Sequence, residues 1–197
     1  KGLVKDVVDL AAFKDDLNAQ CFSCKAVANN NIAACKKIQD KNRLSECRQI
    51  VMVLRLFNEL NKNKQVTNAA LDTCKEALGD MLGENLGDKC KLICSTYLTG
   101  DPAPLRDYFK GEDGPLWLAI FSGDTKYCNY GSDKKATQED CLSNAAFSLA
   151  IRSDNKELCS EINNPKLRII CEVYFKKDER ECEDFLNSEL AKKGGES

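Results

Sequence analysis

The chain has 197 residues, of which 43% are hydrophobic and 30% charged, and it carries a formal net charge of −2. This length supports a substantial hydrophobic core, in one domain or two small ones. Lysine and glutamate are interspersed instead of forming blocks, so nucleic acid and anionic membrane surfaces are not expected as partners. No run of about 18 apolar residues occurs, and no membrane span is expected.

Cysteine usage is the unusual feature, because the chain has twelve cysteines and no histidine. An even count without histidine is typical of disulfides formed in an oxidising compartment. We therefore expect about six disulfides and a secreted, periplasmic or cell-surface protein. The chain begins Lys-Gly-Leu-Val-Lys, without an apolar signal segment, which predicts that a leader has been cleaved or is not included in this sequence. The cysteines expected to pair are Cys21, Cys24, Cys35, Cys47, Cys74, Cys90, Cys94, Cys128, Cys141, Cys159, Cys171 and Cys182.

Hydrophobic periodicity predicts helices throughout the first part of the chain. Residues 3–28 form a one-sided amphipathic pattern that ends at an asparagine run, and a short helix is expected around Cys35. Residues 42–61 are apolar over most of the helix circumference, which indicates a central helix covered on two sides. The elements expected next are a polar connector at 61–65 and amphipathic helices at 68–82 and 90–98.

The character of the chain changes between residues 99 and 133, where three of the four prolines and five of the eleven glycines fall. Proline and glycine interrupt long helices, so short helices are expected at 103–110 and 114–121. We accordingly divide the chain into an N-terminal helical half (1–98), an irregular aromatic middle segment (99–135) and a C-terminal helical half (136–197). These parts are expected to form one compact domain or two tightly packed subdomains.

Capping signals mark the helices of the C-terminal half. Its expected helices span 138–152, 155–162, 165–176 and 179–192. The predicted N-terminal signals are Thr137 with Asp140, Asp154 with Glu157, Asn164 with Pro165, and Asp178 with Glu181. No segment shows a convincing strand pattern. The sequence therefore predicts an all-α fold, a stack of helical hairpins with imperfect repeats and about six disulfides.

Two segments with the same cysteine spacing lie near the two ends of the chain. They contain Cys24, Cys35 and Cys47, and Cys159, Cys171 and Cys182. Helical hairpins could place Cys35 opposite either of its two neighbours, and the same choice exists for Cys171. Pairing across the two segments is a further option, and the sequence does not choose. Each short disulfide loop is expected to stabilise the fold by about 3 kcal/mol.

A short element recurs in these segments, with the pattern Cys-x-x-Ile-(Asn/Gln)-(Asn/Asp) at 35–40 and at 159–164. It resembles cysteine-bearing helical repeats of proteins exported by bacteria and archaea. The resemblance covers only part of the chain. It implies an exported helical fold and no particular activity, so no functional residue is carried over from it.

Three alternative roles for cysteine remain open. Cys21-Phe-Ser-Cys24 is a C-x-x-C motif, which favours a redox pair in a βαβ setting that this chain lacks. Lys25 follows it, as in a variant haem-attachment motif, but no histidine is available as a second axial ligand. Cys90 and Cys94 share one helical face and could bind Cu(I) or Zn(II). In this the chain resembles bacterial copper-storage bundles, which are also exported, helical and rich in cysteine.

Enzymatic motifs are absent from the sequence. Without histidine there is no Ser-His-Asp or Cys-His arrangement, and no phosphate-binding glycine motif occurs. No enzymatic activity and no cofactor are expected. The function predicted is an exported interaction or ligand-binding module for a protein, peptide or small ligand, with thiolate metal storage as the alternative and an enzyme of unknown class as the second alternative.

Aromatic residues of the middle segment are the candidate binding residues, because tryptophan and tyrosine dominate recognition surfaces. We predict a groove between the two halves of the chain. The competing interpretation is a small satellite core beneath the irregular turns. The residues concerned are Tyr108, Trp117, Phe121, Tyr127 and Tyr130.

Overall fold

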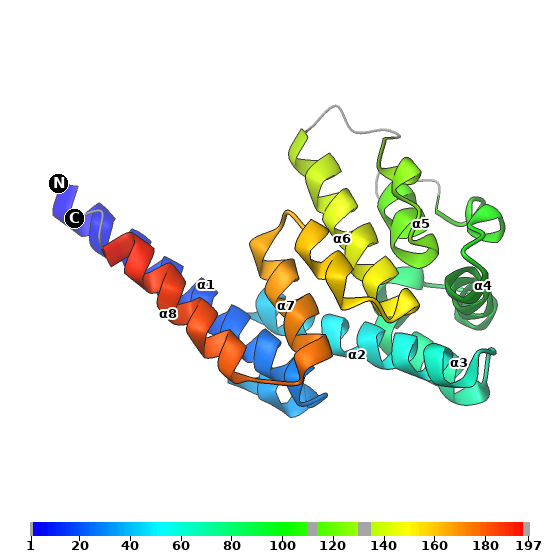
Figure 1. Cartoon of the computed structure of the whole chain (residues 1–197). Coiled ribbons are helices and arrows are strands. Elements are labelled where there is room, and N and C mark those ends of the chain that lie inside the picture. Colours follow the sequence, from blue (N-terminus) through cyan, green and yellow to red (C-terminus); the bar gives the residue numbers. More distant parts are fainter. Residues whose placement is uncertain (1, 110–113, 130–134, 195–197) are drawn as a thin grey trace. The chain divides into compact units, whose positions relative to one another are not determined.

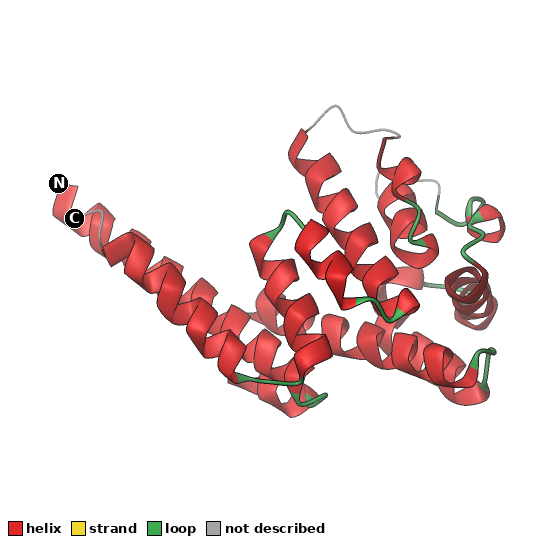
Figure 2. Cartoon of the chain, viewed as in Figure 1, coloured by secondary structure: helices red, strands yellow, loops and turns green. Residues whose placement is uncertain are grey.

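The computed structural model describes residues 2–109, 114–129 and 135–194. All regular structure in these residues is helical, with no strand among them (Figure 2). The predicted all-α class is therefore confirmed. In chain order the elements are α1 (Gly2–Ala28), the 3₁₀ helix η1 (Ile32–Lys37), α2 (Lys41–Asn63), α3 (Asn68–Leu82), α4 (Leu86–Thr99), η2 (Ala103–Leu105), α5 (Gly114–Ser122), η3 (Thr125–Asn129), α6 (Lys135–Ser153), η4 (Lys156–Glu161), α7 (Pro165–Lys176) and α8 (Arg180–Gly194) (Figure 1).

The main differences from the predicted elements occur in short segments. The helices expected around Cys35 and at 155–162 are 3₁₀ helices, and the helix expected at 103–110 is limited to η2 and the turn after it. Helix α2 continues to Asn63, which makes the start of the predicted polar connector helical. Periodicity detects long helices well, whereas short 3₁₀ segments depend on turn chemistry that periodicity does not register.

The predicted helix caps are partly correct. Asn164 Oδ1 accepts hydrogen bonds from the amides of residues 166 and 167, at 3.0 and 3.2 Å, and Pro165 occupies the first helical position, as predicted. The prediction for Asp154 is wrong, because its φ is 51° and Asn155 caps η4 instead. The prediction for Thr137 is also wrong, since this residue lies inside α6.

The chain forms two compact units. Unit 1 consists of Lys1–Val51 and Val173–Ser197, and unit 2 of Met52–Glu172. Unit 1 therefore contains segments from both ends of the chain, whereas unit 2 is its continuous middle. The division differs from that of the predicted halves, because each half contributes residues to both units.

In unit 1, α1 and α8 lie side by side and antiparallel (Figure 1). A disulfide between Cys24 and Cys182 joins them. Beside this disulfide, Lys25 forms an ion pair with Glu183 at 2.5 Å. The two ends of the sequence are thus covalently linked across an interhelical contact, with charged groups at its margin.

The hydrophobic core of unit 2 contains a stacked aromatic pair. Phe57 from α2 and Tyr97 from α4 are fully buried, and their ring centroids are 4.1 Å apart. Tyr97 donates a hydrogen bond to Asn61 Oδ1 at 3.3 Å, and the Asn61 amide nitrogen donates to the carbonyl of Ile151 at 2.8 Å. Asn61 therefore links α2 to both α4 and α6.

One turn geometry ends a helix at five places among the described residues. A residue with positive φ precedes an asparagine or aspartate whose side chain accepts the amide hydrogen bond of the residue two positions later, at 2.9–3.1 Å. The pairs are Asn30-Asn31, Gly100-Asp101, Gly123-Asp124, Asp154-Asn155 and Lys177-Asp178. The residues four positions after the capping residue are all buried: Cys35, Leu105, Cys128, Cys159 and Cys182. The matching cysteine segments thus share a turn that positions one sulfur of a disulfide.

Ten of the twelve cysteines form five disulfides, so the expectation of about six is wrong. The pairs are Cys24–Cys182, Cys35–Cys47, Cys74–Cys90, Cys128–Cys141 and Cys159–Cys171. Cys21 and Cys94 are buried free thiols, in contrast to the prediction that all twelve would pair. The pairing that the sequence left open is thereby assigned. Each of the two cysteine segments contains one local disulfide, and the remaining members, Cys24 and Cys182, pair across the segments.

Five disulfides indicate that the chain folds in an oxidising extracellular compartment. A search of the described residues finds no helix with both the length and the apolar character needed to cross a membrane.

Candidate functional site

The aromatic residues predicted to bind a partner occupy different environments in unit 2. Phe121 is 1% exposed and Tyr127 is 7% exposed, so these two serve the core. Trp117 on α5 is half-buried, and Tyr108, in the turn after η2, is 48% exposed. Tyr130 lies outside the described residues. The four described residues all belong to unit 2. Two of their rings are buried and two are accessible to solvent.

Phe109 joins the accessible rings, although it was not among the residues predicted to bind. Its ring centroid lies 6.3 Å from that of Trp117 and 6.2 Å from that of Phe121. Trp117 and Phe121 stack with centroids 5.9 Å apart. Phe121 therefore forms the buried base of a three-ring cluster. We call Tyr108, Phe109 and Trp117 the aromatic surface, because these rings retain solvent exposure.

Gly114 permits this cluster to form. A Cβ atom at this position would lie 2.2 Å from the backbone carbonyl oxygen of Phe109, a distance that no side chain tolerates. The first turn of α5 can therefore approach Phe109 only because residue 114 is glycine. This contact holds Phe109 beside the helix that carries Trp117.

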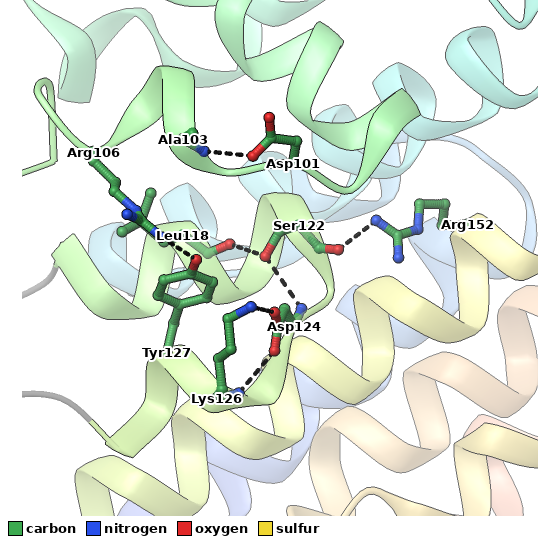
Figure 3. A network of polar contacts seen from close by, with 9 residues as sticks. All are labelled: Asp101, Ala103, Arg106, Leu118, Ser122, Asp124, Lys126, Tyr127 and Arg152. Atoms are coloured by element: carbon green, nitrogen blue, oxygen red, sulfur yellow. Dashed lines mark hydrogen bonds and ion pairs between the residues drawn. The ribbon is translucent and has the colours of Figure 1, made fainter.

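A polar network surrounds the base of α5 (Figure 3). Arg106 donates a hydrogen bond to the Tyr127 hydroxyl at 2.8 Å, and its guanidinium carbon lies 5.7 Å from the centroid of that ring. Asp124 pairs with Lys126 at 2.5 Å. Burial acts to raise the pKa of the Asp124 carboxyl, but the hydrogen bonds from the side chain and the amide of Lys126, together with its charge, outweigh burial and lower that pKa. The contact of Arg106 with Tyr127 joins the end of η2 to η3 beside α5.

Arg152 links two helix ends in the same unit. Its guanidinium donates a hydrogen bond to the carbonyl of Ser122, at the last residue of α5. A Cβ atom at Gly123 or at Gly100, which ends α4, would lie 3.1 Å from the guanidinium. A cation at two helix C-termini interacts favourably with both helix dipoles.

Replacing Arg152 with alanine is expected to lower the free energy of unfolding by about 1.5–3 kcal/mol, because a charge-assisted hydrogen bond to a part-buried carbonyl is lost. Denaturant unfolding followed by circular dichroism measures the change. Arg152→Lys keeps the charge without the planar fork and should recover part of the loss. Equal stability of Arg152→Ala and the parent chain would contradict this role.

Unit 1 contains a groove of about 480 Å³ between α1, η1 and the start of α2. Its lining includes the Phe22 ring and charged residues of both signs, which are Asp15, Asp16, Lys37, Asp40 and Arg43. Arg43 forms an ion pair with Asp16 at 2.7 Å, Asp40 accepts the amide hydrogen bond of Arg43, and the Lys37 ammonium lies 5.7 Å from the centroid of the Phe22 ring. Structural contacts thus occupy most of the charged groups of this groove.

The alternative hypothesis of a thiolate metal site had Cys90 and Cys94 as its two ligands, and the structure removes one of them. Cys90 is bonded to Cys74 and is therefore not a thiolate, which leaves Cys94 alone on that face of α4. Burial raises the pKa of the Cys94 thiol to about 12. In the described residues, no group of three or more Cys, Asp or Glu side chains has the arrangement of a metal site.

Comparisons of the chain with protein-family models, with curated proteins and with solved structures yield no match.

Proposed function

We propose that this chain is a binding module without chemistry of its own toward other molecules, secreted, periplasmic or attached to a cell surface, and that its aromatic surface receives a protein or peptide partner. The helices and disulfides would serve as a rigid support for that surface. Its components are Tyr108, Phe109 and Trp117, all in unit 2.

The half-buried state of Trp117 carries this proposal. Trp117 already stacks on Phe109 and Phe121, so its ring is held in place before any partner arrives. Tyr108 adds a side chain that is 48% exposed. Rigid, partly exposed aromatic side chains lose little conformational entropy on binding, and they are enriched among the residues that contribute most to affinity.

The compartment supports the same proposal. A chain stabilised by five disulfides is suited to persist outside the cytosol, where a partner would be an extracellular or surface molecule. The balanced charge favours a partner bound mainly through apolar and aromatic contacts, because no large field steers an oppositely charged one.

Photo-crosslinking can identify the partner. Benzoylphenylalanine placed at position 108 is expected to capture a discrete partner from the extracellular proteins of the source organism. Position 66 is the matched control, because Val66 is another exposed large hydrophobic residue of unit 2, at 38% exposure. Equal capture at both positions would contradict a partner specific for the aromatic surface.

Replacing Trp117 with alanine is then expected to weaken binding of that partner by about 30- to 1,000-fold, the usual effect of removing a tryptophan from the centre of an interface. Calorimetry measures the affinity of the parent, Trp117→Ala and Val66→Ala chains. Because Trp117 is the sole tryptophan, acrylamide quenching of its fluorescence should also decrease when the partner binds. Unchanged affinity of a folded Trp117→Ala chain, together with unchanged quenching, would overturn the proposal.

A further inference from the structure

Unit 1 contains a free thiol beside a disulfide on the same helix. Cys21 and Cys24 both belong to α1 and are separated by one helical turn. Cys24 is bonded to Cys182 of α8, whereas Cys21 is free and 8% exposed. The C-x-x-C motif is therefore a thiol next to one half of a disulfide, an arrangement on which thiol–disulfide exchange can act.

Helix geometry brings the two α1 cysteines within bonding reach. Residues at i and i+3 of an α-helix have Cα atoms about 5 Å apart, inside the range of about 4.4–6.8 Å found for disulfides. Their Cβ atoms lie about 5–6 Å apart, whereas a disulfide requires about 3.5–4.5 Å. One turn of α1 must therefore tighten toward 3₁₀ geometry, in which side chains at i and i+3 eclipse.

We propose that Cys21 is an exchange thiol for the disulfide between α1 and α8. The Cys21 thiolate attacks the sulfur of Cys24, a Cys21–Cys24 bond forms, the Cys24–Cys182 bond breaks, and Cys182 leaves as a thiolate. The proton that Cys21 loses goes to solvent, and Cys182 takes up a proton afterwards. The number of disulfides is unchanged, so no external oxidant or reductant is consumed.

The consequence of exchange is the release of α8 from its covalent link. Cys182 is the sole cysteine of α8, so no other disulfide can hold this helix to α1. The contacts that remain between the two segments include the ion pair of Lys25 with Glu183 and the hydrogen bond from the Asn29 side chain to Glu179. Exchange therefore converts a covalently closed pair of helices into one that can open.

The surroundings of Cys21 set the pH dependence of this step. Burial raises the pKa of the Cys21 thiol, Lys25 on α1 opposes that increase, and Glu183 on α8 together with Glu179 before it adds to it. The attacking thiolate is consequently scarce at neutral pH. The rate is expected to rise about tenfold for each pH unit until the pH approaches that raised pKa.

Cys94 provides a matched comparison in unit 2. It is also a buried free thiol and lies one turn after a disulfide-bonded cysteine, Cys90. Its surroundings differ, because Cys94 is fully buried, burial raises its pKa to about 12, and no cation opposes that effect. Cys94 should not take part in thiol–disulfide exchange at the pH values at which Cys21 reacts.

Peptide mapping tests the exchange. The oxidised chain is incubated at pH 7, 8 and 9, quenched in acid, alkylated with N-ethylmaleimide under denaturing conditions and digested with trypsin without reduction. We expect alkylated Cys182 in peptide 181–192, together with peptide 15–25 carrying an internal disulfide, and these products should form faster at higher pH. Cys21→Ser should abolish both products, and Cys94→Ser should leave them unchanged.

A second variant tests whether the product can form. In Cys182→Ser, mild oxidation should close Cys21–Cys24, so that peptide 15–25 loses two hydrogens and resists alkylation. The proposal is overturned if Cys182→Ser keeps two free thiols in that peptide after oxidation. It is also overturned if the parent chain retains the Cys24–Cys182 link at every pH, or if Cys24 instead of Cys182 is released.

Discussion

Reduction of the disulfides is expected to destabilise the chain more than any single substitution. Four of the five disulfides close loops with sequence separations of 12 to 16 residues. Each is worth about 3 kcal/mol when strain is small, because it restricts the unfolded chain. Since total stabilities are about 5–15 kcal/mol, the reduced chain should be largely unfolded at 37 °C.

Thermal unfolding followed by circular dichroism, with and without a phosphine reductant, measures this effect. The double variant with serine at Cys35 and Cys47 isolates one short loop and should lose about 3 kcal/mol. The corresponding variant at Cys24 and Cys182 removes the link between residues 158 positions apart. Its loss should be larger, up to about 5 kcal/mol. An unchanged melting transition in reductant would show that noncovalent packing alone maintains the fold.

Long helices were predictable because apolar periodicity marks them along most of the chain, and at some of them a helix cap agrees. The pattern at 165–176 is an example, where Asn164 and Pro165 mark a start that the structure reproduces. The 3₁₀ helices were not predictable in this way. The turn before them did have a signal: an asparagine or aspartate precedes Cys35, Cys128, Cys159 and Cys182 by four residues. A 3₁₀ helix follows this turn at the first three, whereas the α-helix α8 follows it at Cys182.

The pairing of the cysteines could not be obtained from sequence, because pairing depends on which helices become neighbours. Spacing made Cys35 equally compatible with Cys24 and with Cys47, and only the contact of α1 with α8 assigns Cys24 to Cys182. The same limit applies to the aromatic surface. Aromatic content drew attention to this segment, but the burial of Phe121 and the partial exposure of Trp117 follow from how α5 packs.

Asn61 shows why a polar residue can be misread. As the first residue of a polar run it was assigned to a connector, yet it lies within α2 and hydrogen-bonds to Tyr97 and to the carbonyl of Ile151. Sequence polarity predicts solvent exposure on average, whereas a part-buried polar residue such as Asn61, whose hydrogen bonds are made, joins elements that apolar contacts alone would not align.

Replacing Phe57 with alanine is expected to lower the free energy of unfolding by about 3–5 kcal/mol, because a fully buried phenyl ring is lost and a cavity is left. The loss includes the stacking contact with Tyr97, whose ring centroid lies 4.1 Å away. Denaturant unfolding gives the free energy. Phe57→Leu retains most of the volume and should lose considerably less.

Two further variants compare this stack with the hydrogen bond beside it and with the aromatic surface. Tyr97→Phe keeps the stack and removes only the hydroxyl that donates to Asn61, so a loss of about 1 kcal/mol is expected. Trp117→Ala removes a larger ring, but that ring is only half-buried, so its loss should be smaller than that of Phe57→Ala. If Trp117→Ala proved more destabilising than Phe57→Ala, the aromatic surface would be part of the core, and the binding role proposed for it would lose its basis.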